Sequence, residues 1–264
     1  MMIVSVMVYG PPGSGKTHFI GQVCRKFGSA LVIDVEGGTL PVHRVCPSAK
    51  RVRTPAELTG EGVEVITLPQ FSAVRQVIQY VRGRFRGQYY VGVIDSLTEL
   101  SYAATQYALS DRREVGFRSD ERPGLQDYLD ALNALRALIR DFRETFPVSI
   151  VTCLEQYRVE ELPPNILPAL TGRLQHEVPA LMDEVWRLIR ASGGRVVLTC
   201  TSGSAVAKSR LGLSNIEVPE QEWDGGALLY QVASEYYELL GYGTTSTVNP
   251  VETQTQSSTE VQNE

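Results

Sequence analysis

Short apolar runs rich in β-branched residues recur along the chain, and they alternate with stretches whose apolar residues repeat every three or four positions. The first pattern predicts buried strands and the second predicts amphipathic helices. Buried strands are predicted at 2–9, 30–35, 63–68, 89–94 and 148–154. Helices are predicted at 16–27, 70–85, 97–109, 125–144 and 227–240. The chain therefore reads as an α/β protein in which strands and helices follow one another.

Three connections in this pattern are long. Residues 39–62 and 157–176 contain repeated prolines, and we expect both to be irregular because proline interrupts regular elements. Residues 110–124 are rich in charged side chains and predict an exposed loop that ends at Pro123-Gly124.

Near the end of the pattern, residues 184–190 and 195–201 predict a β-hairpin that turns at Ser192-Gly193-Gly194. Strands that alternate with helices predict a doubly wound, mostly parallel sheet, to which the hairpin adds an antiparallel edge. From Gly241 onward the sequence turns to Thr, Ser, Gln and Glu, a composition typical of disorder. We therefore expect one domain over 1–240 and a disordered tail over 241–264.

In a doubly wound sheet, ligands bind outside the carboxyl ends of the strands. Four candidate groups follow such strand ends: the loop that begins at Gly10, then Glu36, Asp95 and Gln156. We expect them to converge on one edge of the sheet.

Composition narrows the classes of function. With 264 residues and 43% hydrophobic content, the chain can bury a sizeable core. Its net charge of −5 argues against coating nucleic acid by overall charge, so any nucleic-acid site must be local. No apolar run approaches the ~20 residues of a membrane span, and no leader pattern opens the chain. The cysteines lack metal-ligand spacing, which predicts reduced, mostly buried thiols in the cytosol; they are Cys24, Cys46, Cys153 and Cys200.

The most specific motif joins the first predicted strand to the first predicted helix. It reads Gly10-Pro11-Pro12-Gly13-Ser14-Gly15-Lys16-Thr17 and matches G-x-x-x-x-G-K-[ST] at every defined position. Glycines let backbone N–H groups approach phosphates, and the helix N-terminus adds free donors and the positive end of its dipole. We expect Lys16 to reach the β- and γ-phosphates and the Thr17 hydroxyl to bind Mg²⁺. The motif predicts a nucleoside triphosphate site.

Two carboxylates complete this candidate site. Asp95 ends the apolar run 91–94, where P-loop NTPases carry the aspartate that holds Mg²⁺. Ser96 follows it, so no glutamate is available there to orient water. Glu36, at the end of another predicted strand, is the best candidate for that role, because a carboxylate can accept a proton from the attacking water. The alternatives are a strand-end cap for Asp95 and a surface loop position for Glu36.

The order of these motifs resembles the core of RecA-type recombinases. The residues that end at Glu36 are similar to the strand that carries the catalytic glutamate of that family, and 93–96 are similar to its Walker-B strand. Gln156 stands where the family carries an Asn-Gln pair whose Gln senses the γ-phosphate, although Glu155 replaces the Asn. The resemblance implies a RecA-like P-loop NTPase fold that binds ATP and Mg²⁺.

Lys208-Ser209-Arg210 resembles the Lys-x-Arg element of RadA and KaiC and the equivalent pair of lysines in RecA. In those relatives the two cations reach across a subunit interface to the γ-phosphate of the neighbour. The resemblance therefore implies a homo-oligomer with nucleotide at its subunit interfaces, in which Lys208 and Arg210 act on the neighbour. A solvated basic turn is the alternative.

The first strand begins at the first residues, so the RecA polymerisation segment is lacking, and this reduced architecture resembles the phage RecA-like single-strand-annealing ATPases. The RecA pattern also implies DNA-binding loops at 110–124 and 157–176, where cations and aromatic residues are diluted by acidic ones. Cleaner basic patches lie at 43–53 and at Arg75, Arg82, Arg84 and Arg86. Solvated faces are the alternative for both patches.

Three functions fit these features. The leading hypothesis is an oligomeric Mg²⁺-dependent ATPase that binds single-stranded DNA in recombination or strand annealing. The second is a RecA-like ATPase that remodels or scaffolds a protein partner, as KaiC-type and loader proteins do, without DNA contact. A small-molecule kinase is the third, and it has less support because nothing resembles a substrate lid.

Overall fold

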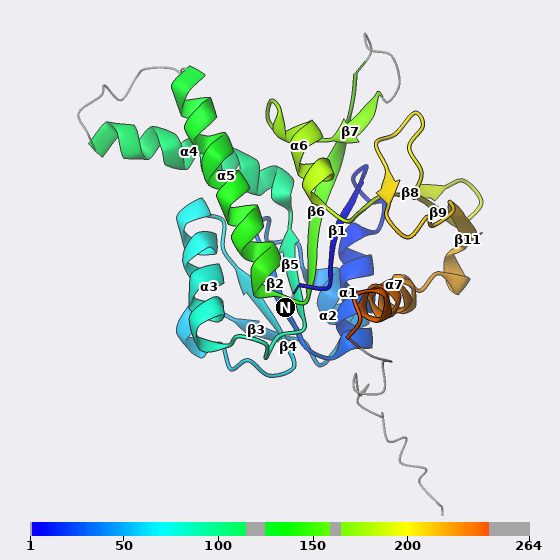
Figure 1. The fold of residues 1–264 in the computed structure, drawn as a ribbon. Helices are drawn as coiled ribbons and strands as arrows, with labels where there is room; N and C mark the ends of the chain where they lie inside the picture. Colours follow the sequence, from blue (N-terminus) through cyan, green and yellow to red (C-terminus); the bar gives the residue numbers. More distant parts are fainter. Residues whose placement is uncertain (1, 115–124, 159–164, 243–264) are drawn as a thin grey trace, which may run out of the picture.

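A single 11-stranded sheet runs through the computed structural model, which describes residues 2–114, 125–158 and 165–242 (Figure 1). The strands pair in the order β11-β9-β8-β1-β6-β5-β2-β4-β3, while β10 pairs with β8 and β7 with β6. Their bounds are β1 (Val4–Gly10), β2 (Ala30–Asp34), β3 (Lys50–Val52), β4 (Val63–Thr67), β5 (Val91–Asp95), β6 (Val148–Tyr157), β7 (Ile166–Pro168), β8 (Glu184–Ala191), β9 (Arg195–Thr199), β10 (Lys208–Ser209) and β11 (Ile216–Pro219).

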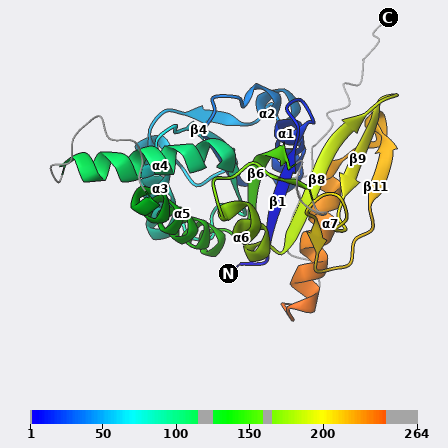
Figure 2. The same cartoon turned by 90° about the horizontal axis from the view of Figure 1, so that it is seen from above.

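The strands along the path β8-β1-β6-β5-β2-β4-β3 are all parallel, whereas β7, β9, β10 and β11 are antiparallel to the strands with which they pair. The predicted doubly wound, mostly parallel sheet with an antiparallel hairpin at one edge is therefore confirmed. Figure 2 shows this antiparallel part at the opposite end of the molecule from α3, α4 and α5.

Helices cover both faces of the sheet, because alternate side chains of the central strands enter two separate cores. Met7 and Tyr9 pack with α3, α4, α5 and α6, whereas Val6 and Val8 pack with α1, α2 and α7. Strands buried on both faces require the continuous apolar runs seen in the sequence. The helix bounds are α1 (Lys16–Phe27), α2 (Leu40–Val45), α3 (Phe71–Arg84), α4 (Leu97–Glu114), α5 (Leu125–Thr145), α6 (Leu174–Leu181) and α7 (Gly225–Leu239), with short 3₁₀ helices η1 (Pro55–Glu57) and η2 (Glu220–Glu222).

The prediction that residues 39–62 and 157–176 are irregular is partly wrong. Residues 39–62 contain α2, β3 and η1, and residues 165–176 contain β7 and the start of α6. These elements span only three to eight residues, too few for a hydrophobic period to stand out. The strand predicted to end at position 154 continues to Tyr157, because β7 pairs with its last residues.

The charged loop expected at 110–124 is wrong over its first residues, since α4 continues to Glu114. Residues 115–124 lie outside the described residues, as do 159–164 and the tail beyond Tyr242. All four cysteines are buried and free. No helix in the described ranges combines the length and apolar character that crossing a membrane requires.

Gly92, in the middle of β5, offers a test of this packing. A Cβ at this position would lie 2.3 Å from the ring of Phe146, which is buried. Gly92→Ala should therefore lower the free energy of unfolding by about 1–3 kcal/mol, the usual cost of overpacking a core. Chemical denaturation measures it.

The matched control is Gly83→Ala in α3, where an added Cβ meets nothing within 4 Å. Alanine favours helix, so this variant should keep the parent stability or gain up to about 1 kcal/mol. Equal stability of the two variants would contradict the packing described for β5.

Candidate functional site

The loop between β1 and α1 has a backbone that only glycine adopts at low cost. Gly13 and Gly15 have φ values of 75° and 98°, in the left-handed region. Gly10 is required for a different reason, since a Cβ there would lie 2.1 Å from the carbonyl oxygen of Leu188 in β8. The predicted strand, loop and helix are all present, and the loop lies at the carboxyl end of β1.

Lys16 folds back over this loop. Its ammonium donates to the carbonyl oxygens of Gly10 and Pro11 at 3.0 and 2.9 Å and to Ser14 Oγ at 3.4 Å. Burial lowers the pKa of Lys16, while Asp95 and Glu36 oppose that shift. The three acceptors of this buried ammonium are neutral oxygens. A bound phosphate would be a stronger acceptor, because its negative charge strengthens the hydrogen bond.

Thr17 and Asp95 meet at the start of α1. Thr17 Oγ1 donates to Asp95 Oδ2 at 3.0 Å, and Thr152 of β6 donates to Asp95 Oδ1. Burial raises the pKa of Asp95 to about 6, although the hydrogen bonds from the two hydroxyls act to lower it. The described residues hold no cluster of three or more metal-ligating side chains. A hydroxyl beside one carboxylate fits Mg²⁺, which takes few protein ligands when phosphates supply the rest.

Glu36 is brought to the same place by a loop built on Asp34. The buried Asp34 carboxylate accepts the N–H groups of Glu36, Gly37 and Gly38 at 3.2, 2.8 and 3.2 Å. It also accepts from the hydroxyls of Thr39 and Thr67. Glu36 Oε1 in turn accepts a hydrogen bond from Ser96, the residue after Asp95. The loop, Asp95 and Glu36 therefore converge as expected.

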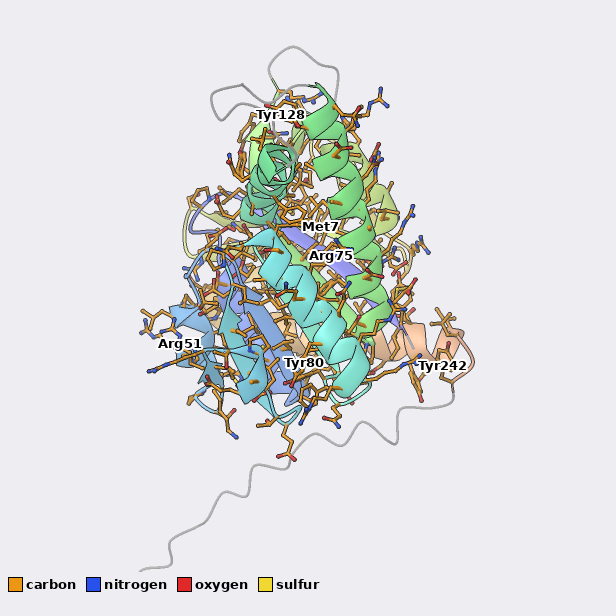
Figure 3. The ribbon with its side chains drawn as sticks, turned by 90° about the vertical axis from the view of Figure 1, so that its left-hand side faces the viewer. Met7, Arg51, Arg75, Tyr80, Tyr128 and Tyr242 are labelled. Carbon is orange, nitrogen blue, oxygen red and sulfur yellow. The ribbon has the colours of Figure 1, made fainter. Side chains whose placement is uncertain are left out.

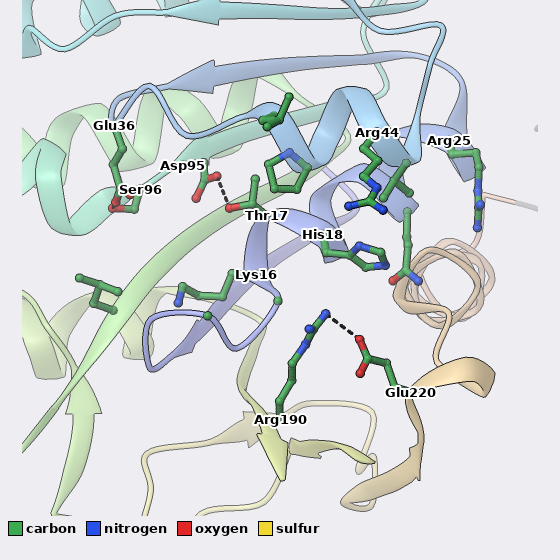
Figure 4. Close-up of a pocket in the computed structure, with 17 residues that line it drawn as sticks. Lys16, Thr17, His18, Arg25, Glu36, Arg44, Asp95, Ser96, Arg190 and Glu220 are labelled. Carbon is green, nitrogen blue, oxygen red and sulfur yellow. Dashed lines mark hydrogen bonds and ion pairs between the residues drawn. The ribbon is translucent and has the colours of Figure 1, made fainter. Parts of the chain in front are cut away.

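A cavity of about 860 Å³ opens over these groups (Figure 4), a volume in the range of ligand sites. It adds basic and acidic side chains that the sequence analysis did not assign to the nucleotide site. These are His18, Arg25, Arg44, Arg190 and Glu220. His18 directly follows the motif, so its position could have been inferred. Arg25 lies further along the same helix, whereas Arg44, Arg190 and Glu220 come from segments that only the tertiary fold brings together.

Gln156 is not part of this cavity. It lies within β6 rather than after it, and its side-chain amide donates to Gln175 of α6. Its neighbour Glu155 forms an ion pair with Arg187 of β8 at 2.8 Å, and the Glu155 side chain is 3% exposed. The Glu155 side chain thus contacts β8, and the Gln156 side chain contacts α6.

Lys208 and Arg210 lie at the opposite end of the sheet from the loop. Lys208 pairs with Val185 at the start of β8, while the loop follows the end of β1. The Lys208 ammonium donates to the carbonyl oxygen of Met182 at 2.5 Å, and Arg210 pairs with Asp183 at 3.1 Å. Within one chain these cations therefore lie toward the amino ends of β8 and β1, whereas the phosphate-binding loop lies at the carboxyl end of β1.

A family model described as an AAA domain matches residues 3–211, and no significant match was found among curated proteins. The chain is similar to the crystal structure of the RadB recombinase, with a TM-score of 0.46, 15% identity, and coverage of 82% of this chain and 86% of that chain. It is also similar to a prototypical ATPase from the type III secretion system of pathogenic bacteria, with a TM-score of 0.47, 16% identity, and coverage of 72% and 53%.

The family match covers well over half of the chain and includes the loop at 10–17, Glu36 and Asp95. The predicted P-loop ATPase core is thereby confirmed. The chain belongs to the AAA domain family and is an ATP-hydrolysing P-loop NTPase.

Proposed function

We propose that this ATPase depends on Mg²⁺, binds single-stranded DNA in recombination or strand annealing, and works as a homo-oligomer in the cytosol. The observation that carries the proposal is the contact of Thr17 with Asp95 at the start of α1, inside a cavity large enough for a nucleotide. The four buried free thiols suit a reducing compartment.

In the proposed mechanism, the loop amides and Lys16 bind the phosphate chain. Thr17 and Asp95 would hold Mg²⁺, which when bound neutralises charge on the phosphates. Glu36 acts on the attacking water. Its Oε1 is occupied by the Ser96 hydroxyl, while its Oε2 has no partner in the part of the chain that the structure describes. That second oxygen is placed to accept a hydrogen bond from water and then its proton.

Glu36→Gln keeps the size of the side chain and removes its basicity. ATP should bind as in the parent protein, while turnover falls by a factor of ~10² or more, within the span of a lost general base. Steady-state hydrolysis and calorimetric binding of MgATP separate the two effects.

Two variants frame this result. Lys16→Ala should lose binding itself, because it removes the cation that faces the phosphates. Glu57→Gln, on the exposed η1 helix and outside the cavity, should hydrolyse ATP at the parent rate. Normal turnover by Glu36→Gln would move the role of base to another group.

Support for a nucleic-acid site comes from exposed cations on the face that carries β3 and α3 (Figure 3). Arg51 and Arg53, on β3 and just after it, are exposed and have no ion pair among the described residues. Arg82 of α3, in contrast, already pairs with Asp141 and Glu144, both at 3.0 Å. Cations without carboxylate partners are the ones free to neutralise phosphates. The part of this face at β3 is therefore better suited to bind a DNA backbone than the part at α3.

The double variant Arg51→Ala, Arg53→Ala should weaken binding of a single-stranded oligonucleotide by about tenfold at low salt. It should also flatten the salt dependence, because fewer counterions are released. Fluorescence anisotropy across a salt series measures both.

The matched control replaces two arginines that are already paired, Arg82→Ala with Arg195→Ala, the latter held by Glu217 at 2.6 Å. It should bind DNA nearly as the parent does. Equal losses in both double variants, or a parent ATPase that neither binds single-stranded DNA nor responds to it, would favour a protein partner instead.

Lys208 and Arg210 support the proposed assembly, because they lie outside the cavity of their own chain, so a neighbour's nucleotide is the one that they would contact. In that place they would stabilise charge on the γ-phosphate, as an arginine finger does in trans. Arg210 is the more available of the two, since its side chain is 55% exposed.

Arg210→Ala should therefore bind MgATP normally and hydrolyse it ~10³-fold more slowly. The fold should survive, because Asp183 keeps its hydrogen bonds from the Ser5 N–H and hydroxyl at 2.9 and 2.6 Å. Mixing this variant with Lys16→Ala subunits should restore part of the activity. Parent-rate hydrolysis by Arg210→Ala, or mixtures that never recover, would reduce the segment to a solvated turn.

A further inference from the structure

β8 carries an arginine past the end of β1 and over the phosphate-binding loop. The last parallel pair of the two strands joins Tyr9 to Arg187, and β8 then continues in the hairpin, where Arg190 pairs with Val196. The fit between β8 and the loop is close, as the packing of Gly10 on the Leu188 carbonyl shows. The backbone of β8 therefore places Arg190 next to the loop.

The guanidinium of Arg190 lies beside Gly15, the residue that caps the N-terminus of α1. A Cβ at Gly15 would lie 3.4 Å from Arg190 Nε and 3.6 Å from Nη2. Both Gly15 and Arg190 line the cavity (Figure 4). The N-terminus of α1 is the positive end of its dipole, and its first turn holds no acidic residue. The positive end of the dipole repels a cation in that position, and an anion bound beside both would offset this repulsion.

Other basic side chains share the cavity with Arg190. His18 follows the loop, and its pKa is lowered by burial and next by Arg190. Arg25 and Arg44 line the same cavity. The carboxylate that Arg190 does contact is Glu220 of η2, at 2.9 Å, and both side chains are nearly half exposed. An ion pair so exposed to solvent is worth little, so a stronger anion can replace it.

We propose that Arg190 donates to a phosphate group of the nucleotide bound by its own chain, and that Glu220 competes for Arg190 when the cavity holds no nucleotide. The proposal rests on the assignment of the nucleotide to this loop. Arginine suits the position because its planar fork can donate two parallel hydrogen bonds to a phosphate. It adds a binding residue from the β8–β9 hairpin to those of the loop, far along the chain from the motif at 10–17.

The test is a double-mutant cycle on the full chain, with MgATP affinity measured by calorimetry. Arg190→Ala should weaken affinity by about tenfold to a hundredfold, as expected for lost charge-assisted hydrogen bonds. Glu220→Gln should strengthen it by about twofold to fivefold, because the competitor is gone. In the Arg190→Ala background, Glu220→Gln should have no effect.

A matched pair that joins β9 of the same hairpin to β11 controls for charge and exposure. Arg195 pairs with Glu217 at 2.6 Å, with an exposed fraction of 43% for the arginine, the same as Arg190. Arg195→Ala and Glu217→Gln should leave MgATP affinity within twofold of the parent.

Lys16→Ala separates failure of this proposal from failure of the assignment on which it rests. If Lys16→Ala abolishes binding while Arg190→Ala stays within twofold of the parent, the loop assignment stands and the role of Arg190 is overturned. An equal effect of Glu220→Gln with and without Arg190 would overturn the competition. A parent protein that binds no MgATP would overturn both.

Discussion

The site depends on carboxylates buried at strand ends, each made tolerable by hydrogen bonds from the elements it joins. Burying a charge is costly unless it is hydrogen-bonded. Asp95 is satisfied by Thr17 of α1 and Thr152 of β6, so it fastens the first turn of α1 to the centre of the sheet. Asp34 satisfies three amides of the loop that presents Glu36. The hydrogen bonds that satisfy these buried carboxylates therefore also set the geometry of the cavity.

The antiparallel part of the sheet has a role beyond covering an edge. The Leu188 carbonyl packs on Gly10, so the hairpin and the phosphate-binding loop form one rigid contact. From this contact β8 reaches Arg190, and η2 supplies Glu220 across the mouth of the cavity. The chain after η2 enters α7, which packs against α1. Gln22 of α1 bonds both Trp223 and Gly225 at that entry.

Local signals allowed much of this to be predicted from the sequence. The loop and Asp95 lie in contiguous motifs, and the strand end before Glu36 is marked by an apolar run. Gln156 shows where such reasoning stops, since the prediction ended β6 at Leu154. Pairing with β7 extends the strand, and alternation along it then decides which way Gln156 points. Arg190 and Glu220 carry no motif, and their meeting depends on the tertiary path of the hairpin.

β3 also bears on how the protein behaves in concentrated solution. It is the terminal strand of the sheet and, among the residues that the structure describes, pairs with β4 alone. An unpaired strand edge is a template for another chain, and exposed lysines and arginines are a common protection against such pairing. Lys50 and Arg51 are exposed on this short strand. The same positive charges that suit a phosphate backbone thus disfavour strand pairing between molecules. Solubility therefore favours these charges whether or not the protein binds a nucleic acid.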